Sequence, residues 1–167
     1  MGKSEPIRFE EYLEKYGDLT YTNVGVSMLP MLRQRRDIMI IRRKEKNERC
    51  KKYDVALYIR PPHDYVLHRI VDVTDTGYTF LGDNCYAKEY DIKEEQVIGV
   101  LKAFVRNGKK SRDGRIIRNG RMISVDNKLY KVYYHLNYFF YPLRRIRLRA
   151  RRKAARVVRK LQAMLKK

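Results

Sequence analysis

The sequence predicts a mainly β fold whose helices lie only near its two ends. Three observations lead to this prediction: short runs rich in β-branched and aromatic residues, clusters of turn-forming residues between these runs, and helical spacing of apolar residues only near the termini. The chain has 167 residues, which is enough to bury one core but not two independent ones. We therefore expect one β-rich domain with appendages.

The first predicted element is a short amphipathic helix over residues 5–16. Ser4 followed by Glu5 and Pro6 is a typical helix start, and Gly17 is a typical helix end. Between them, apolar and aromatic residues recur at intervals of three and four. We expect residues 1–19 to form an N-terminal helical segment.

Six runs of the next segment have the composition of strands. Turns such as Asn107-Gly108 and Asn119-Gly120 separate some of them. The runs cover residues 37–41, 55–59, 65–73, 78–81, 96–105 and 122–125. The pattern predicts an all-β domain with short connections over residues 20–127.

The last segment, residues 128–167, reads as an aromatic stretch followed by a basic helix. Aromatic side chains crowd together from Tyr130 to Tyr141, and Pro142 marks a break. After the break apolar residues recur every three or four positions, with Arg and Lys on the other faces. The recurring residues are Leu143, Ile146, Ala150, Ala154, Val157, Leu161 and Met164.

The charge of the chain is concentrated in this tail and suggests an anionic partner. The net charge is +20, and residues 142–167 hold twelve Lys or Arg with no Asp or Glu. Such a helix is expected to lie in an anionic membrane interface through residues 143–167. The same charge would also neutralise the phosphates of a nucleic acid. In a third interpretation the aromatic stretch belongs to the core and the helix is only solvated.

The two cysteines and the polar N-terminal segment indicate the compartment. Cys50 and Cys85 are too few for a disulfide framework, and residues 1–18 are charged throughout, unlike a secretory leader. No window approaches the roughly 18 to 20 uncharged apolar residues of a membrane-spanning helix. These features predict a cytoplasmic protein that associates peripherally with a membrane.

Ser27 and His68 are the strongest candidates for catalytic residues. Ser27 lies in an apolar segment between Gly25 and Pro30, and His68 follows forty-one residues later on a predicted strand. A serine nucleophile needs such a base, and a histidine with a pKa near ~6.5 suits that task. Taken alone, Ser27 would more often be a turn serine and His68 an ordinary strand histidine, and the other motifs reverse this preference.

Four short motifs resemble those of signal peptidase I in their order. They are Ser27 to Pro30, His68 to Val71, Gly82-Asp83-Asn84, and Val97 to Val100. Each is weak alone, but together they cover roughly residues 20–105. The resemblance implies the coiled, partly closed β-sheet of the signal peptidase and LexA-like superfamily. It also implies a serine endopeptidase that cleaves peptide or precursor-protein bonds.

The resemblance further implies roles for individual residues. His68 stands where bacterial signal peptidases carry a lysine base, so the chain is similar to the Ser-His type. Asp83 would orient His68, and Asp91 is a further candidate acid. Met28, Leu29 and Met31 would line the substrate cleft, and the backbone N–H of Ser27 would donate to the oxyanion.

No cofactor is expected. The three histidines and two cysteines lack metal-ligand spacing, and there is no phosphate-binding glycine-rich loop. The competing hypothesis is a non-enzymatic basic β-domain that binds nucleic acid or a membrane surface. It would resemble the carboxy-terminal half of LexA-type repressors, although those carry a helix-turn-helix region before this half and use a lysine base.

Overall fold

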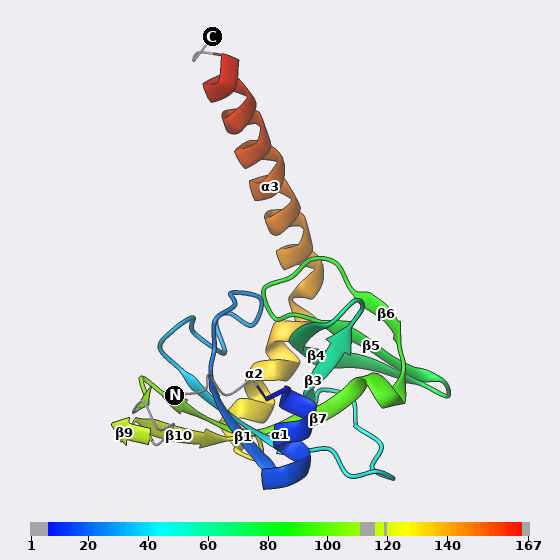
Figure 1. Cartoon of the computed structure of the whole chain (residues 1–167). Coiled ribbons are helices and arrows are strands. Elements are labelled where there is room, and N and C mark those ends of the chain that lie inside the picture. Colours follow the sequence, from blue (N-terminus) through cyan, green and yellow to red (C-terminus); the bar gives the residue numbers. More distant parts are fainter. Residues whose placement is uncertain (1–6, 111–115, 119, 165–167) are drawn as a thin grey trace.

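The body of the molecule is one large antiparallel sheet, seen in a computed structural model that describes residues 7–110, 116–118 and 120–164 (Figure 1). Seven strands follow the order β1-β2-β7-β3-β4-β5-β6, and an eighth, β10, pairs with β7. Their bounds are Asp18–Thr22 (β1), Ile38–Arg43 (β2), Val55–Arg60 (β3), Asp64–Thr74 (β4), Gly77–Leu81 (β5), Glu89–Ile92 (β6), Val97–Arg106 (β7) and Arg121–Ser124 (β10). The predicted mainly β class is confirmed.

Each of the six predicted runs contains a strand, but the sequence did not indicate the two strands at the ends of the order. β1 and β6 are short and largely polar, as edge strands often are, so their composition resembles that of loops. No pairing joins β1 to β6 in the described part of the chain, so the sheet stays open. An unclosed sheet is compatible with the partly closed sheet that the resemblance implies, and the specific signal-peptidase-like fold stays a prediction.

Strand β7 organises the sheet because it has partners along its whole length. Its first half pairs with β3, through Val100 and Ala56, and its second half pairs with β10, through Val105 and Met122. Its other edge pairs with β2. A run of mostly apolar residues suits this central position, since most of its side chains are buried.

The core lies on both faces of the sheet. Alternate residues of β3 divide between the two faces: Val55 and Leu57 join one cluster, and Ala56 and Tyr58 join the other. The first cluster also includes Leu13 from helix α1 (Phe9–Tyr16), and residues from the loop after β1 and from helix α2 (Lys128–Phe139). These segments cover that face.

Helix α1 is shorter than the predicted helix. It begins at Phe9, and residues 5 and 6 of the predicted span lie outside the described residues. It ends at Gly17, whose φ of 78° and N–H donation to the carbonyl of Leu13 at 2.9 Å form a C-terminal cap. A short 3-10 helix, η1 (Glu94–Gln96), and a two-stranded sheet of β8 (Lys109–Lys110) and β9 (Ile116–Arg118) complete the body.

The aromatic stretch divides between core and surface. In α2, Tyr130 is buried, and Tyr141 at the start of helix α3 (Tyr141–Met164) packs on Val71 and Leu81. Phe139 and Phe140 remain exposed. Helix α3 projects away from the body as a long arm (Figure 1). Among the described helices, none is long and apolar enough to cross a membrane.

Candidate active site

The Ser27 turn is held by apolar residues beneath it. After β1 the amide of Asn23 donates to the carbonyls of Gly25 at 2.9 Å and Leu32 at 3.3 Å, which closes the loop. Met28 and Leu32 are fully buried in the first core cluster. Ser27 itself stays half-buried, so its hydroxyl lies at the surface of a rigid turn.

The turn also docks on the loop that follows β5. The backbone N–H of Asn84 donates to the carbonyl of Ser27 at 2.7 Å, and its side chain donates to the carbonyl of Val26 at 3.2 Å. The predicted Gly82-Asp83-Asn84 motif therefore contacts the serine turn directly. These bonds fix the position of Ser27 relative to the sheet.

His68 lies on β4, buried at 6% exposure, with its two ring nitrogens facing different surroundings. Nδ1 lies 3.1 Å from Oε1 of Glu89 and 3.4 Å from the hydroxyl of Tyr58. Nε2 faces Gly82. A carboxylate on one nitrogen fixes the tautomer and leaves the other nitrogen to exchange a proton.

Gly82 is the point where the parts of the site meet. A Cβ atom on Gly82 would lie 2.9 Å from Nε2 of His68, 2.8 Å from the carbonyl oxygen of Ser27 and 2.7 Å from Sγ of Cys85. Any larger residue would force these groups apart, so glycine permits the close approach. The serine turn, the imidazole and the Cys85 thiol are thereby brought together.

The charges around His68 stabilise its cationic form. Burial lowers the pKa of the imidazole, but hydrogen bonding and charge at Cys85 and Glu89 outweigh it and raise the pKa to about 9. The hydrogen bond to His68 and one to Tyr58 lower the pKa of Glu89 to about 2 despite its burial. The contact between His68 and Glu89 contributes to both pKa shifts, and Cys85 contributes further to that of His68.

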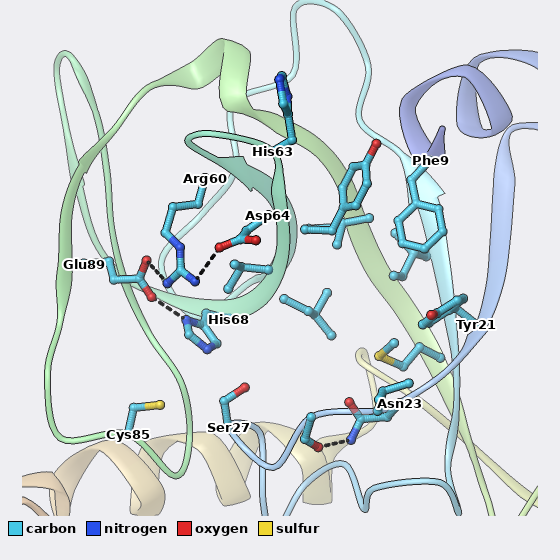
Figure 2. A pocket seen from close by; sticks show the side chains of 18 of the residues that line it. Phe9, Tyr21, Asn23, Ser27, Arg60, His63, Asp64, His68, Cys85 and Glu89 are labelled. Carbon is cyan, nitrogen blue, oxygen red and sulfur yellow. Dashed lines mark hydrogen bonds and ion pairs between the residues drawn. The ribbon is translucent and has the colours of Figure 1, made fainter. Parts of the chain in front are cut away.

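A cavity of about 890 Å³ opens beside this pair (Figure 2). Ser27, His68, Cys85 and Glu89 line one end, as Figure 2 shows. Most of the other lining side chains are apolar or aromatic, among them Phe9, Leu19, Tyr21, Leu57, Tyr65 and Leu67. Charged and polar residues also line it: Asn23, Arg60, His63, Asp64 and Arg152. An apolar cavity with a few convergent polar groups at one end is typical of a small-molecule or peptide site.

Asp83 does not hold His68, contrary to the expectation. Its carboxylate accepts two hydrogen bonds from Arg69, at 2.8 and 2.7 Å, and one from the hydroxyl of Tyr133 at 3.1 Å. Successive residues of a strand point to opposite faces, so His68 and Arg69 face away from each other. The acid on His68 is Glu89, and Asp83 belongs to a buried ion pair on the other face.

The expected substrate-lining residues and the second candidate acid also lie elsewhere. Met28 and Met31 are core residues, and neither they nor the half-buried Leu29 line the cavity. Asp91 is exposed on β6, with a φ of 58°, and is not part of the cavity lining. Glu89, two residues earlier on the same strand, takes the position at His68.

The Ser27 hydroxyl and backbone N–H are unpaired within the described ranges. The hydroxyl is therefore free of a competing turn hydrogen bond and also lacks a direct bond to His68. Catalytic hydrogen bonds are often long before substrate binds. The N–H has no partner among the described residues that would prevent its predicted donation to an oxyanion, and Gly25 offers no side-chain donor beside it.

Besides Glu89, two residues of the site were not predicted. Cys85 follows the Gly82-Asp83-Asn84 motif by one residue, and its proximity to His68 depends on the loop folding back, with its N–H donating to the carbonyl of Gly82 at 2.8 Å. Tyr58 lies two residues from the partner of His68 on the neighbouring strand. Pairing of β3 with β4 brings Tyr58 there, and a single sequence does not reveal that register.

Comparison with known proteins identifies no relative of this chain. No protein-family model, curated protein or solved structure matches it. Within the described residues, no cluster of three or more His, Cys, Asp or Glu could hold a metal ion.

Proposed function

We propose that the protein is a serine endopeptidase that resembles signal peptidase I and uses a Ser-His mechanism. The observation that carries this proposal is the arrangement of Ser27, His68 and Glu89 at one end of an open, mainly apolar cavity. The antiparallel β-sheet of the body is compatible with the signal-peptidase-like fold that the motif order implies.

In this mechanism the Ser27 hydroxyl attacks the carbonyl carbon of a peptide bond and gives its proton to Nε2 of His68. Glu89 stabilises the imidazolium through Nδ1 without being protonated itself. The backbone N–H of Ser27 donates to the oxyanion of the tetrahedral intermediate. His68 then protonates the leaving amine, and water releases the acyl group from Ser27 by the reverse steps.

The side chains that line the cavity suggest an extended, apolar substrate segment. Leu67 precedes His68 on β4, its partner on β3 is Leu57, and both leucines line the cavity together with Tyr21 and Tyr65. These residues replace Met28, Leu29 and Met31 as the proposed contacts for the substrate. An apolar wall favours uncharged side chains, because burial of an unpaired charge there is costly.

The proposal is tested with a fluorophosphonate probe that reacts covalently with activated serines. We expect labelling of the full-length protein, no labelling of Ser27→Ala, and unchanged labelling of Ser124→Ala, which removes an exposed hydroxyl outside the cavity lining. His68→Gln should also prevent labelling. A chain that takes no label at any pH from about 6 to 10, where His68 passes from cation to neutral base, is not a peptidase of this kind.

We further propose that α3 docks the protein on an anionic membrane surface. Three apolar side chains of its stripe are largely exposed: Ile146 is 68% exposed, and Leu143 and Val157 are similarly accessible. Phe139 and Phe140 add exposed aromatic area where the arm begins. Apolar area bordered by Arg and Lys fits an interfacial helix better than nucleic-acid binding, which needs no apolar stripe.

A further inference from the structure

Cys85 is the second nucleophilic side chain in the cavity, and the peptidase mechanism does not use it. Its Sγ and Nε2 of His68 both lie within 3 Å of the position that a Cβ on Gly82 would occupy. The thiol is partly accessible and lines the cavity beside Ser27 and Glu89. Figure 2 shows Cys85 at the same end of the cavity as Ser27 and His68.

The surroundings of Cys85 match those that make a thiol reactive. The nucleophile is the thiolate, and a neighbouring imidazolium stabilises a thiolate electrostatically. Glu89 holds Nδ1 of His68 at 3.1 Å, which keeps the ring cationic and leaves Nε2 directed toward Cys85 and Gly82. The carboxylate, imidazole and thiol thus form a series from Glu89 through His68 to Cys85.

Cys50 provides an internal comparison. It is buried in the second core cluster with Tyr58, Tyr78 and Phe80 as neighbours. Burial and the nearby carboxylate of Asp54 raise the pKa of its thiol to about 12. A cysteine in such surroundings is inert, so the two thiols of the chain should differ widely in reactivity.

We propose that Cys85 is a modification site at which the thiol, activated by His68, forms a mixed disulfide with a small disulfide that enters the cavity. The Cys85 thiolate attacks one sulfur of the disulfide, a new S–S bond forms and the old one breaks. The other half leaves as a thiolate and takes up the proton that Cys85 lost, which His68 holds in the meantime. The group added to Sγ then occupies the space between His68 and Ser27.

The test uses dithiodipyridine, a neutral disulfide that the positive charge of the protein does not concentrate. At pH 7 we expect one equivalent of released thione from the folded protein, with mass spectrometry locating the modification on Cys85 and not on Cys50. Cys85→Ala should abolish the reaction, and Cys50→Ala should leave its rate unchanged. His68→Gln should slow it by about tenfold, because the variant removes the imidazole that lies beside the attacking sulfur.

A comparison within the wild-type chain keeps the test independent of whether His68→Gln folds. At pH 6, Cys85 in the folded protein should react faster than the same cysteine in urea-unfolded protein, where no imidazolium is held beside it. A slower reaction in the folded state, or equal modification of Cys50 and Cys85, would overturn the proposal.

A last measurement separates this inference from the proposed peptidase. Ser27→Ala should leave the reaction of Cys85 intact, because the serine plays no part in it. In wild type, the mixed disulfide should block fluorophosphonate labelling of Ser27, and a reductant such as dithiothreitol should restore it. Only this blocking rests on the proposed function, so a reactive Cys85 in a protein that never labels at Ser27 would reject the peptidase and keep the thiol site.

Discussion

His68 and Arg69 are neighbours in the chain, yet each binds a different carboxylate. His68 pairs with Glu89 beside the cavity, whereas Arg69 pairs with Asp83 in the interior, where both side chains are 2% exposed. The first pair sets the protonation state of a candidate base. The second joins β4 to the loop after β5 and, through Tyr130 and Tyr133, to α2.

Glu89→Gln should move the pH dependence of peptide cleavage. The imidazole is a base only when neutral, and its pKa of about 9 places the rise in activity well above the ~6.5 of an isolated histidine. Loss of the carboxylate removes one cause of that raised pKa, so the rise should shift down by about one unit or more. The pH profile of kcat/KM and the NMR titration of His68 both measure this shift.

The matched control is Asp64→Asn, which removes a carboxylate that binds Arg60 but not His68. Its pH profile should coincide with that of wild type. An unchanged profile in Glu89→Gln would mean that another group governs the ionisation.

Asp83→Asn should instead reduce stability. It leaves the buried Arg69 without its charged partner, and breaking such a pair costs about 3 kcal/mol or more. Urea unfolding followed by circular dichroism measures the loss. Asp72→Asn, at an exposed position on the same strand as Arg69, should change the free energy of unfolding by less than about 0.5 kcal/mol. Equal stability of the two variants would contradict a structural role for Asp83.

At the scale of elements, the site depends on two loops that meet over the sheet. The serine turn follows β1, and the loop of residues 82–85 follows β5, and the two are joined by the Asn84 hydrogen bonds. Their contact depends on the missing side chain of Gly82. The geometry of the site is therefore a property of loop packing as much as of the residues themselves.

Gly82→Ala should separate these loops and impair the site. The added methyl group would lie under 3 Å from backbone and imidazole atoms, and a displacement of about 1 Å in a catalytic group can cost about a hundredfold in rate. Gly25→Ala is the control, since its nearest atom, the Ser27 hydroxyl oxygen, would be 3.9 Å away. We expect fluorophosphonate labelling of Ser27 to fall about a hundredfold in the first variant and to persist in the second.

At the scale of the whole molecule, the basic arm and the cavity are connected. Arg149 and Arg152 of α3 lie over the ring of Tyr86, and Arg152 also lines the cavity. The hydroxyl of Tyr141 donates to the carbonyl of Tyr86 at 2.8 Å. A surface bound by α3 would thus lie near the loop that carries Cys85.

Replacement of Leu143, Ile146 and Val157 by serine should abolish binding to anionic vesicles. The triple variant keeps every positive charge of α3 but loses the apolar stripe, which contributes roughly 25 cal/mol per Å² of area buried in the interface. Retention on nonspecific DNA should change little, because it depends on phosphate neutralisation. Flotation with phosphatidylserine vesicles measures membrane binding, and filter binding with duplex DNA measures DNA retention.

The matched control replaces Ala150 and Ala154 by serine. These two small residues of the same stripe are exposed, and their replacement should largely preserve vesicle binding. If the triple variant floats with vesicles as wild type does, α3 acts through charge alone. Strong, salt-sensitive DNA binding by a protein that does not bind vesicles would favour the nucleic-acid alternative.

Elements with a local pattern could be predicted from the amino-acid sequence. Residues 65–73 are rich in β-branched and other apolar side chains, and β4 lies there. The spacing of Leu143, Ile146 and Val157 predicts the helix that α3 forms. Which side chains meet depends on how distant segments pack against each other. Strand pairing places Glu89 rather than Asp83 beside His68. Loop packing turns Met28 inward and brings Cys85 to the site. Docking of α2 buries Tyr130, whereas Phe139 stays exposed. These outcomes depend on register and on contacts between distant segments, because a strand presents opposite faces at successive residues and its partners fix which face is buried.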